Sequence, residues 1–102
     1  MIVYGIKTCD TCRKAITTLG AELRDIRVDP LSKAERSRFF EAFGADLLNT
    51  RSTTWRTLSD EERARDPDAL LEDHPTLMKR PVIDHDGQLY LGWGSATKDA
   101  LL

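Results

Sequence analysis

The first 28 residues carry the pattern of a strand, a helix and a second strand, and this pattern limits the fold more than any other feature. Ile2-Val3-Tyr4 is a short apolar, β-prone run that ends at Gly5. From Cys12 to Leu19 apolar residues recur at helical spacing, and Gly20 is placed to end the helix. A second β-prone stretch covers Leu23 to Val28. Because a helix joins the two strands, they should be parallel and the crossover right-handed.

The middle of the chain, from about residue 32 to 79, is predicted to be a helical insert. Asp29-Pro30 breaks the chain, and Ser32 with Glu35 matches a capping box. Ser59 with Glu62 forms another, and Asp66-Pro67 places an N-cap residue before a proline. These signals predict several short helices rather than one long helix. Their expected core consists of Phe39, Phe40, Phe43, Leu47, Leu48, Trp55, Leu58, Leu70 and Leu71.

The last quarter of the chain returns to a β pattern. Val82-Ile83 and Gln88–Leu91 flank Asp86-Gly87, the signal of a two-residue type I′ hairpin. Ser95 is the predicted N-cap of a short terminal helix that runs through Leu101. The resulting order is β-α-β, helical insert, β-β-α, which predicts an α/β fold with a mixed four-stranded sheet.

Length and charge restrict the class of protein further. The 102 residues fit one domain, spanning residues 1–102. A net charge of −2 lacks the basic excess that phosphate-backbone binding requires, so direct nucleic-acid binding is not expected. No apolar run approaches the roughly 18 residues of a membrane span, and the N-terminus does not resemble a secretory signal. We therefore expect a cytoplasmic protein, without membrane association, that is a monomer.

The two cysteines lie three residues apart, as Cys9-Asp10-Thr11-Cys12. They are too few for the disulfide framework of a small secreted protein. Cys9 lies at the mouth of the predicted helix, where unpaired N–H groups and the helix dipole favour a thiolate. Lys7 and Arg13 add positive charge nearby in the sequence. A pKa of about 7 or below is typical of such a cysteine, which predicts a nucleophile.

Cys12 follows one turn later, on the face that the periodicity predicts to be buried. This placement predicts that Cys9 attacks a substrate and that Cys12 resolves the mixed disulfide. Two inert core cysteines are an alternative reading. A zinc site with His74 and His85 is another, but the histidine spacing exceeds the roughly three to five residues of finger-type sites. We expect His74 to end a helix, His85 to be an exposed loop residue, and no metal to bind.

Three blocks of sequence resemble one known family. They are Tyr4–Ala15, Leu47–Arg56, and His74-Pro75 with Lys79–Ile83, and they cover the chain in the family's order. On these blocks the chain resembles the arsenate reductase (ArsC)/Spx family, and most closely its YffB-like branch of glutathione-dependent thiol reductases. The resemblance implies a thioredoxin-like, or glutaredoxin-like, fold that carries a helical insert. It also implies glutathione, or a thioredoxin or glutaredoxin, as the reductant, with no bound cofactor.

The resemblance also implies roles for individual residues. Cys9 takes the place of the nucleophilic cysteine, and Arg51 and Arg80 fall at or near arginines that surround an anion. A guanidinium binds an oxyanion or carboxylate bidentately and stabilises a nearby thiolate. Solvated surface arginines are the alternative. The family further implies a cis peptide bond at Arg80-Pro81. The residues expected to contact the substrate are Lys7, Thr8, Arg13 and Pro81.

The chain departs from arsenate reductases in ways that bear on the substrate. Gly5 stands where those enzymes have a histidine, and Cys12 replaces a serine. Arg80 is not followed by the family's third arginine; residues Leu89–Trp93 occupy that region. With one cation fewer, a small thiol or disulfide is favoured over arsenate as the substrate. Trp55 and Trp93 are expected either in the core or in a pocket wall.

Three functions therefore remain in view. The first is a thiol-disulfide oxidoreductase, a glutathione-dependent thiol reductase with Cys9 as nucleophile. The second is an arsenate reductase that uses glutathione or glutaredoxin as electron source. The third is a redox-sensing transcriptional regulator similar to Spx, which would bind RNA polymerase and use a Cys9–Cys12 disulfide as a switch.

Overall fold

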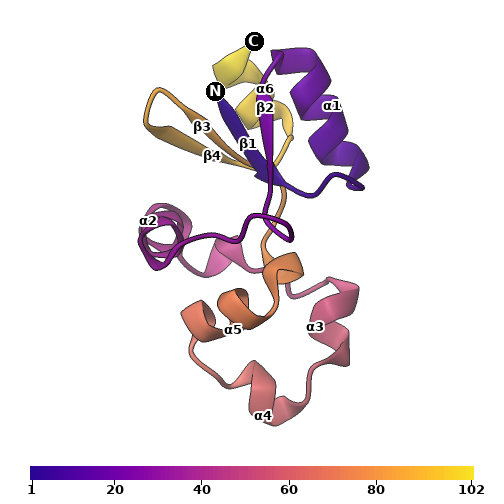
Figure 1. Cartoon of the computed structure of the whole chain (residues 1–102), viewed down its shortest axis with the longest axis vertical. Helices are drawn as coiled ribbons and strands as arrows, with labels where there is room; N and C mark the ends of the chain where they lie inside the picture. Colours follow the sequence, from indigo (N-terminus) through magenta and orange to yellow (C-terminus); the bar gives the residue numbers. More distant parts are fainter. The chain divides into compact units, whose positions relative to one another are not determined.

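The structure is a computed structural model that describes all 102 residues, and its elements are labelled in Figure 1. Along the chain they are β1 (Ile2–Gly5), α1 (Asp10–Leu19), β2 (Glu22–Asp25), α2 (Lys33–Phe43), η1 (Gly44–Leu47), α3 (Thr53–Thr57), α4 (Asp60–Arg63), α5 (Pro67–Asp73), η2 (Pro75–Leu77), β3 (Val82–His85), β4 (Gln88–Leu91) and α6 (Ser95–Leu101). None of these helices combines the length and the apolar character needed to cross a bilayer.

The chain divides into two compact units. The first combines Met1–Asp29 with Arg80–Leu102 and contains all four strands. The second is the continuous segment Pro30–Lys79, which contains helices, turns and one isolated β-bridge between Leu48 and Met78 but no strand. The second unit starts two residues before the predicted insert and ends at the same residue.

A mixed four-stranded sheet forms the centre of the first unit, in the order β2-β1-β3-β4. β1 and β2 are parallel, as the helical crossover predicts, whereas β3 pairs antiparallel with both β1 and β4. In the parallel pair Gly5 lies opposite Asp25, so the segments that follow β1 and β2 leave the same edge of the sheet. The fold class is therefore α/β, with the predicted element order.

β2 is shorter than the sequence predicts. The β-prone stretch continues to Val28, but the strand ends at Asp25. The carbonyl oxygen of Asp25 accepts the N–H groups of Val28 and Asp29, at 3.1 and 2.8 Å, so the chain turns there. The Asp25 carboxylate also accepts the N–H of Arg27 at 2.9 Å. An aspartate that bonds the backbone two residues ahead favours a turn over a strand, which explains the early end.

The C-terminal elements agree with the prediction from the sequence except at two residues. The hairpin turn has positive φ at Asp86 and Gly87, 51° and 87°, as a type I′ turn requires. Gly94, not Ser95, is the N-cap of α6, because the extended Gly94 carbonyl already accepts the N–H of Lys98 at 3.0 Å. His85 is the last residue of β3 and pairs with Gln88, so its prediction as a loop residue is wrong.

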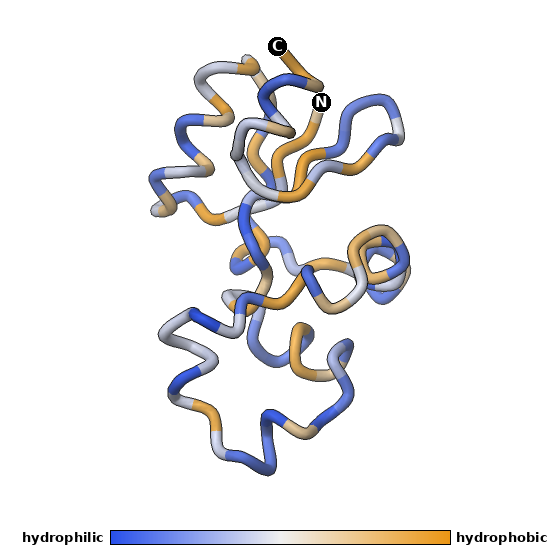
Figure 2. The backbone as a smooth tube through the Cα atoms, turned by 180° about the vertical axis from the view of Figure 1, so that it is seen from behind, coloured by the Kyte–Doolittle hydropathy of each residue, from blue (hydrophilic) through white to orange (hydrophobic).

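The core of the first unit lies between the sheet and α1. Val3, Ala15 and Ile83 are fully buried, and Trp93 packs against them. Figure 2 shows the corresponding hydrophobic stretches along the strands and the hydrophilic hairpin turn. Trp93 therefore belongs to the edge of a hydrophobic core.

The second unit is held together by helix caps and a small hydrophobic cluster. Ser32 and Glu35 form a complete capping box, and the side chains of Ser52 and Ser59 cap α3 and α4. Asp66 occupies the N-cap position of α5 but makes no side-chain cap bond. Leu58, Leu70 and Leu77 form the cluster, against which Leu48 and Trp55 pack. Of the predicted core residues, Phe40, Phe43, Leu48 and Trp55 are only half-buried.

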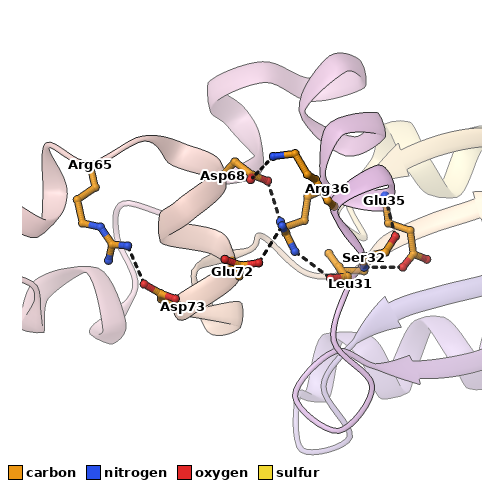
Figure 3. Close-up of polar contacts among 9 residues, drawn as sticks. Leu31, Ser32, Glu35, Arg36, Arg65, Asp68, Glu72 and Asp73 are labelled. Atoms are coloured by element: carbon orange, nitrogen blue, oxygen red, sulfur yellow. Dashed lines mark hydrogen bonds and ion pairs between the residues drawn. The ribbon is translucent and has the colours of Figure 1, made fainter.

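A buried arginine joins α2 to α5 in the second unit (Figure 3). The Arg36 Nε donates to Asp68 at 2.7 Å, and one terminal nitrogen donates to Glu72 at 3.1 Å. The other terminal nitrogen donates to the carbonyl of Leu31 at 3.0 Å. The Arg36 side chain is only 7% exposed, and each of its three nitrogens has a partner. This arginine is committed to holding the unit together.

Candidate active site

Cys9 is the N-cap residue of α1, at the carboxyl end of the central strand β1. Its own N–H donates to the carbonyl of Ile6 at 3.0 Å, which closes the loop that leaves the strand. Its carbonyl accepts the N–H of Arg13 at 3.0 Å, the first bond of the helix. The Cys9 backbone is extended, with φ −83° and ψ 119°, and the residue is half-buried. The sulfur therefore lies at the positive end of the helix and remains open to a reagent.

The surroundings of Cys9 favour its thiolate. Burial raises the pKa of the Cys9 thiol, but the opposing contributions outweigh it. These are the N–H of Cys12, the Cys12 thiol, the positive charge of Arg80 and the N–H of Thr11, and together they hold the pKa of Cys9 below its usual value. The Cys9 side chain makes no cap hydrogen bond to the helix. The N–H groups of the first helical turn therefore act on the sulfur through their dipoles.

Cys12 is chemically the opposite of Cys9. It is fully buried and, like Cys9, a free thiol. Burial raises the pKa of the Cys12 thiol to about 11, although the N–H of Ile6 acts against this, and the neighbouring Cys9 raises it further. The buried Gly5 faces the Cys12 sulfur so closely that a β-carbon at residue 5 would collide with it. Gly5 thus provides the space in which Cys12 stays protonated next to Cys9.

Arg80 and Pro81 bring the start of β3 to the same site. Arg80 is half-exposed, and its charge acts on the thiols of both Cys9 and Cys12. The Arg80-Pro81 peptide bond is cis, as the family resemblance implies. Pro81 is buried, and its carbonyl accepts the N–H of Gly92 at 2.7 Å. The first unit therefore brings together the predicted nucleophile, its predicted partner cysteine and one predicted arginine.

The loop before Cys9 is held by hydrogen bonds to its backbone. The Arg13 Nε donates to the carbonyl of Lys7 at 2.9 Å, so Arg13 turns back from the helix onto the loop. The N–H of Lys7 donates to the Asp25 carboxylate at 3.0 Å. The side chains of Lys7, Thr8 and Arg13 are exposed beside Cys9 in the chain. Their role in substrate binding stays a prediction.

Arg51 lies in the second unit, in the turn before α3. Its N–H donates to the side-chain oxygen of Asn49 at 3.0 Å, and the residue is exposed. The first unit contains Cys9 and Arg80 but not Arg51. The prediction that Arg51 binds the anion of the substrate therefore rests on the sequence resemblance alone.

Sequence reasoning missed two residues, Asp25 and Arg27. Asp25 accepts the N–H groups of Lys7 and Arg27, and the N–H of Lys7 is the strongest influence that lowers the pKa of this carboxyl. Arg27 donates from a terminal nitrogen to the hydroxyl of Thr8 at 3.3 Å. The signal that could have found them is topological: β1 and β2 are parallel, so the residues that end β2 must lie beside the cysteine loop.

Other features do not form a second reactive centre. No group of three or more His, Cys, Asp or Glu side chains is arranged to hold a metal ion. His74 ends α5, as predicted, and its Nε2 lies 3.4 Å from Glu62. An open groove of about 300 Å³ follows the edge strand β2, with Leu23 and Val28 among its lining residues, but Cys9 does not line it.

The sheet order and the cysteine at the N-terminus of the first helix are those of a thioredoxin-like fold. Within this class the sequence matches the ArsC family over residues 4–101, and the chain belongs to that family. An uncharacterized protein of Haemophilus influenzae is 42% identical, with 89% of each chain covered. The global transcriptional regulator Spx 2 of Bacillus cereus is 26% identical, over 91% of this chain and 79% of the regulator.

Solved structures support the same assignment. A protein titled YffB superposes with a TM-score of 0.84 at 28% identity, over 99% of this chain and 97% of its own. An arsenate reductase (ArsC) related protein from Brucella melitensis has a TM-score of 0.74 at 32% identity, over 97% of this chain and 91% of its own. These likenesses confirm the predicted relation to the ArsC, YffB and Spx proteins and the thioredoxin-like fold.

Proposed function

We propose that this chain is a thiol-disulfide oxidoreductase that acts on small disulfides with Cys9 as its nucleophile. The observation that carries the proposal is the difference between its two sulfurs. The pKa of Cys9 is lowered and the residue is only half-buried, whereas Cys12 is fully buried with a pKa raised to about 11. Disulfide exchange by a cysteine pair requires one thiolate that attacks the substrate and a second thiol that later attacks the mixed disulfide. Cys9 fits the first role and Cys12 fits the second.

In the first step the Cys9 thiolate attacks one sulfur of the substrate disulfide. A Cys9–substrate bond forms, the substrate S–S bond breaks, and the other half leaves as a thiolate. In the second step Cys12 attacks the Cys9 sulfur, and the proton that Cys12 loses passes to the departing substrate sulfur. The Cys9–Cys12 disulfide forms and the second substrate thiol leaves, so the substrate is reduced by two electrons and the protein is oxidised by two.

The reduced protein is regenerated by a thiol. Glutathione is the proposed reductant: two molecules give up two electrons and become glutathione disulfide, and a dithiol protein such as thioredoxin or glutaredoxin could do the same. Glutathione can also attack the Cys9–substrate disulfide directly and bypass Cys12. Arg80 stabilises the Cys9 thiolate, and Arg51 is proposed to bind an anionic part of the substrate.

Turnover of a glutathione mixed disulfide tests the proposal. We expect the Cys9→Ser protein to lose all turnover, because no thiolate remains at the helix terminus. The Cys12→Ser protein should keep part of the activity when glutathione is abundant, since glutathione can replace the second thiol. Full activity in Cys9→Ser would rule out Cys9 as the nucleophile.

Arsenate reduction and redox regulation are the two alternatives that the relatives support. The arsenate reductase related structure from Brucella melitensis motivates adding arsenate to the same assay. The similarity to the regulator Spx 2 motivates a second readout, retention of this chain by immobilised RNA polymerase in the reduced and the oxidised state. Repeated turnover of disulfides without polymerase binding supports the enzyme. Binding that depends on the Cys9–Cys12 disulfide, without turnover, supports the regulator.

A further inference from the structure

Resting on the proposed function, we propose that Arg27 is a carboxylate-binding residue that makes Cys9 selective for disulfides with a negative charge near the sulfur. Arg27 is neither one of the two predicted anion-binding arginines nor part of the cysteine motif. It reaches the site from the turn after β2.

The first step of the argument is placement. β1 and β2 are parallel and Gly5 lies opposite Asp25, so the Cys9 loop and the turn that carries Arg27 leave the sheet side by side. A terminal nitrogen of Arg27 lies 3.3 Å from the hydroxyl of Thr8, the residue directly before Cys9. The Arg27 guanidinium therefore lies beside Thr8, the residue that precedes the nucleophile Cys9.

The second step is that Asp25 holds Arg27 there. The Asp25 carboxylate accepts the N–H groups of Lys7 and Arg27 at 3.0 and 2.9 Å. It also lies 3.8 Å from the Arg27 Nε. One carboxylate thus joins the cysteine loop to the β2 turn, and its side chain is only 13% exposed. A guanidinium held in place loses less entropy on binding a ligand than a free one.

The third step is the number of donors that remain. A guanidinium has five N–H groups, and the Arg27 side chain makes one hydrogen bond, to Thr8. The side chain is 44% exposed, so the N–H groups that face neither Thr8 nor Asp25 can meet a ligand. Arg36 in the second unit, whose three nitrogens all have protein partners, shows the opposite case. Arg27 is anchored at one side and open at the other.

The fourth step is the charge around Cys9. Lys7, Arg13, Arg27 and Arg80 surround the loop, against the carboxylates of Asp10 and Asp25. When Cys9 is a thiolate, the four cations exceed the negative charges of the two carboxylates and the thiolate only slightly. The excess positive charge is carried by the exposed side chains around the sulfur. A disulfide with a carboxylate a few bonds from its sulfur would present its charge to these cations while the thiolate attacks.

The experiment measures single-turnover formation of the mixed disulfide on Cys9 in the Cys12→Ser protein. Three reagents are compared: bis(2-carboxyethyl) disulfide, neutral bis(2-hydroxyethyl) disulfide and cationic cystamine. We expect Arg27→Ala to slow the reaction with the anionic reagent about fivefold relative to the neutral one, as for an ion pair of about 1 kcal/mol. Cystamine should react relatively faster. The ratio between reagents cancels any general change in Cys9 reactivity.

Two matched variants separate local binding from the overall field. Arg27→Lys keeps the charge without the guanidinium and should retain part of the preference. Lys14→Ala removes another exposed cation, further along α1, and should leave the ratio within about twofold, because exposed charges are screened. An unchanged ratio in Arg27→Ala, or an equal change in Lys14→Ala, would overturn the inference while Cys9 remains reactive. If Cys9 reacts no faster than an ordinary thiol with all three reagents, the proposed function fails as well.

Discussion

Arg36 in the second unit and the arginines beside Cys9 in the first unit make opposite kinds of contact. In the second unit the Arg36 side chain is 7% exposed and all three of its nitrogens donate to protein oxygens. In the first unit Arg13 and Arg27 each anchor to the cysteine loop by one hydrogen bond and stay 61% and 44% exposed. The network around Arg36 is closed, and the network around Cys9 is open to a ligand.

Arginines with all their partners in the protein contribute to stability, whereas arginines with free N–H groups can take part in substrate binding. A buried arginine with all its partners ties helices together but offers nothing to a substrate. Partly satisfied arginines beside a thiolate stabilise less and can bind an anion. The comparison predicts that damage to the closed network lowers stability without changing Cys9. Changes next to the thiols should alter their coupling or their ionisation.

The largest expected effect comes from Arg36→Met. The substitution leaves Asp68, which is 27% exposed, without its closest cation and should lower the free energy of unfolding by about 3 kcal/mol. Denaturant unfolding gives this value, and the rate of Cys9 alkylation under native conditions is the control. A change of more than about twofold in that rate would show that the two networks are not independent.

The next effect in size is that of Gly5→Ala. A β-carbon at residue 5 would collide with the Cys12 sulfur, so we expect a loss of about 2 kcal/mol in unfolding free energy. The same substitution in a Cys12→Ala background should cost less than half as much, because the sulfur is gone. Equal costs in the two backgrounds would mean that Cys12 is not what keeps residue 5 a glycine.

A smaller effect is expected from pH. The pKa of Cys12 is raised from 9.0 to about 11 in the folded chain, so between these values the unfolded chain loses a proton that the folded chain keeps. Stability should therefore fall as pH rises through this range, by about 1 kcal/mol at pH 10. The measurement is the difference in unfolding free energy between the parent and Cys12→Ala at pH 8 and pH 10. A constant difference would show that Cys12 titrates normally.

Much of the fold could be predicted because its signals are local. The capping box of Ser32 and Glu35 and the Asp86-Gly87 turn each act over a few residues, and the structure has both. The position of Cys9 at a helix terminus follows from the same kind of signal. The early end of β2 could not be predicted from β-propensity, because the Asp25 side chain redirects the backbone.

The part of the site that sequence could not provide depends on contacts between distant segments. Arg27 lies 19 residues from Thr8, and only the parallel pairing of β1 and β2 brings them together. The need for Gly5 is similar, because it arises from the Cys12 sulfur packing on the strand. A stripe of apolar residues predicts that Cys12 is buried, but not which backbone it meets.

The most direct test is the pKa of Cys9. Thiolate absorbance is followed against pH in the Cys12→Ser protein, whose hydroxyl can still donate to Cys9, and in the same protein with Arg80→Ala. We predict a midpoint below the usual cysteine value, and a higher midpoint when the Arg80 charge is removed. A midpoint at or above the usual value, with no response to Arg80→Ala, would contradict the account.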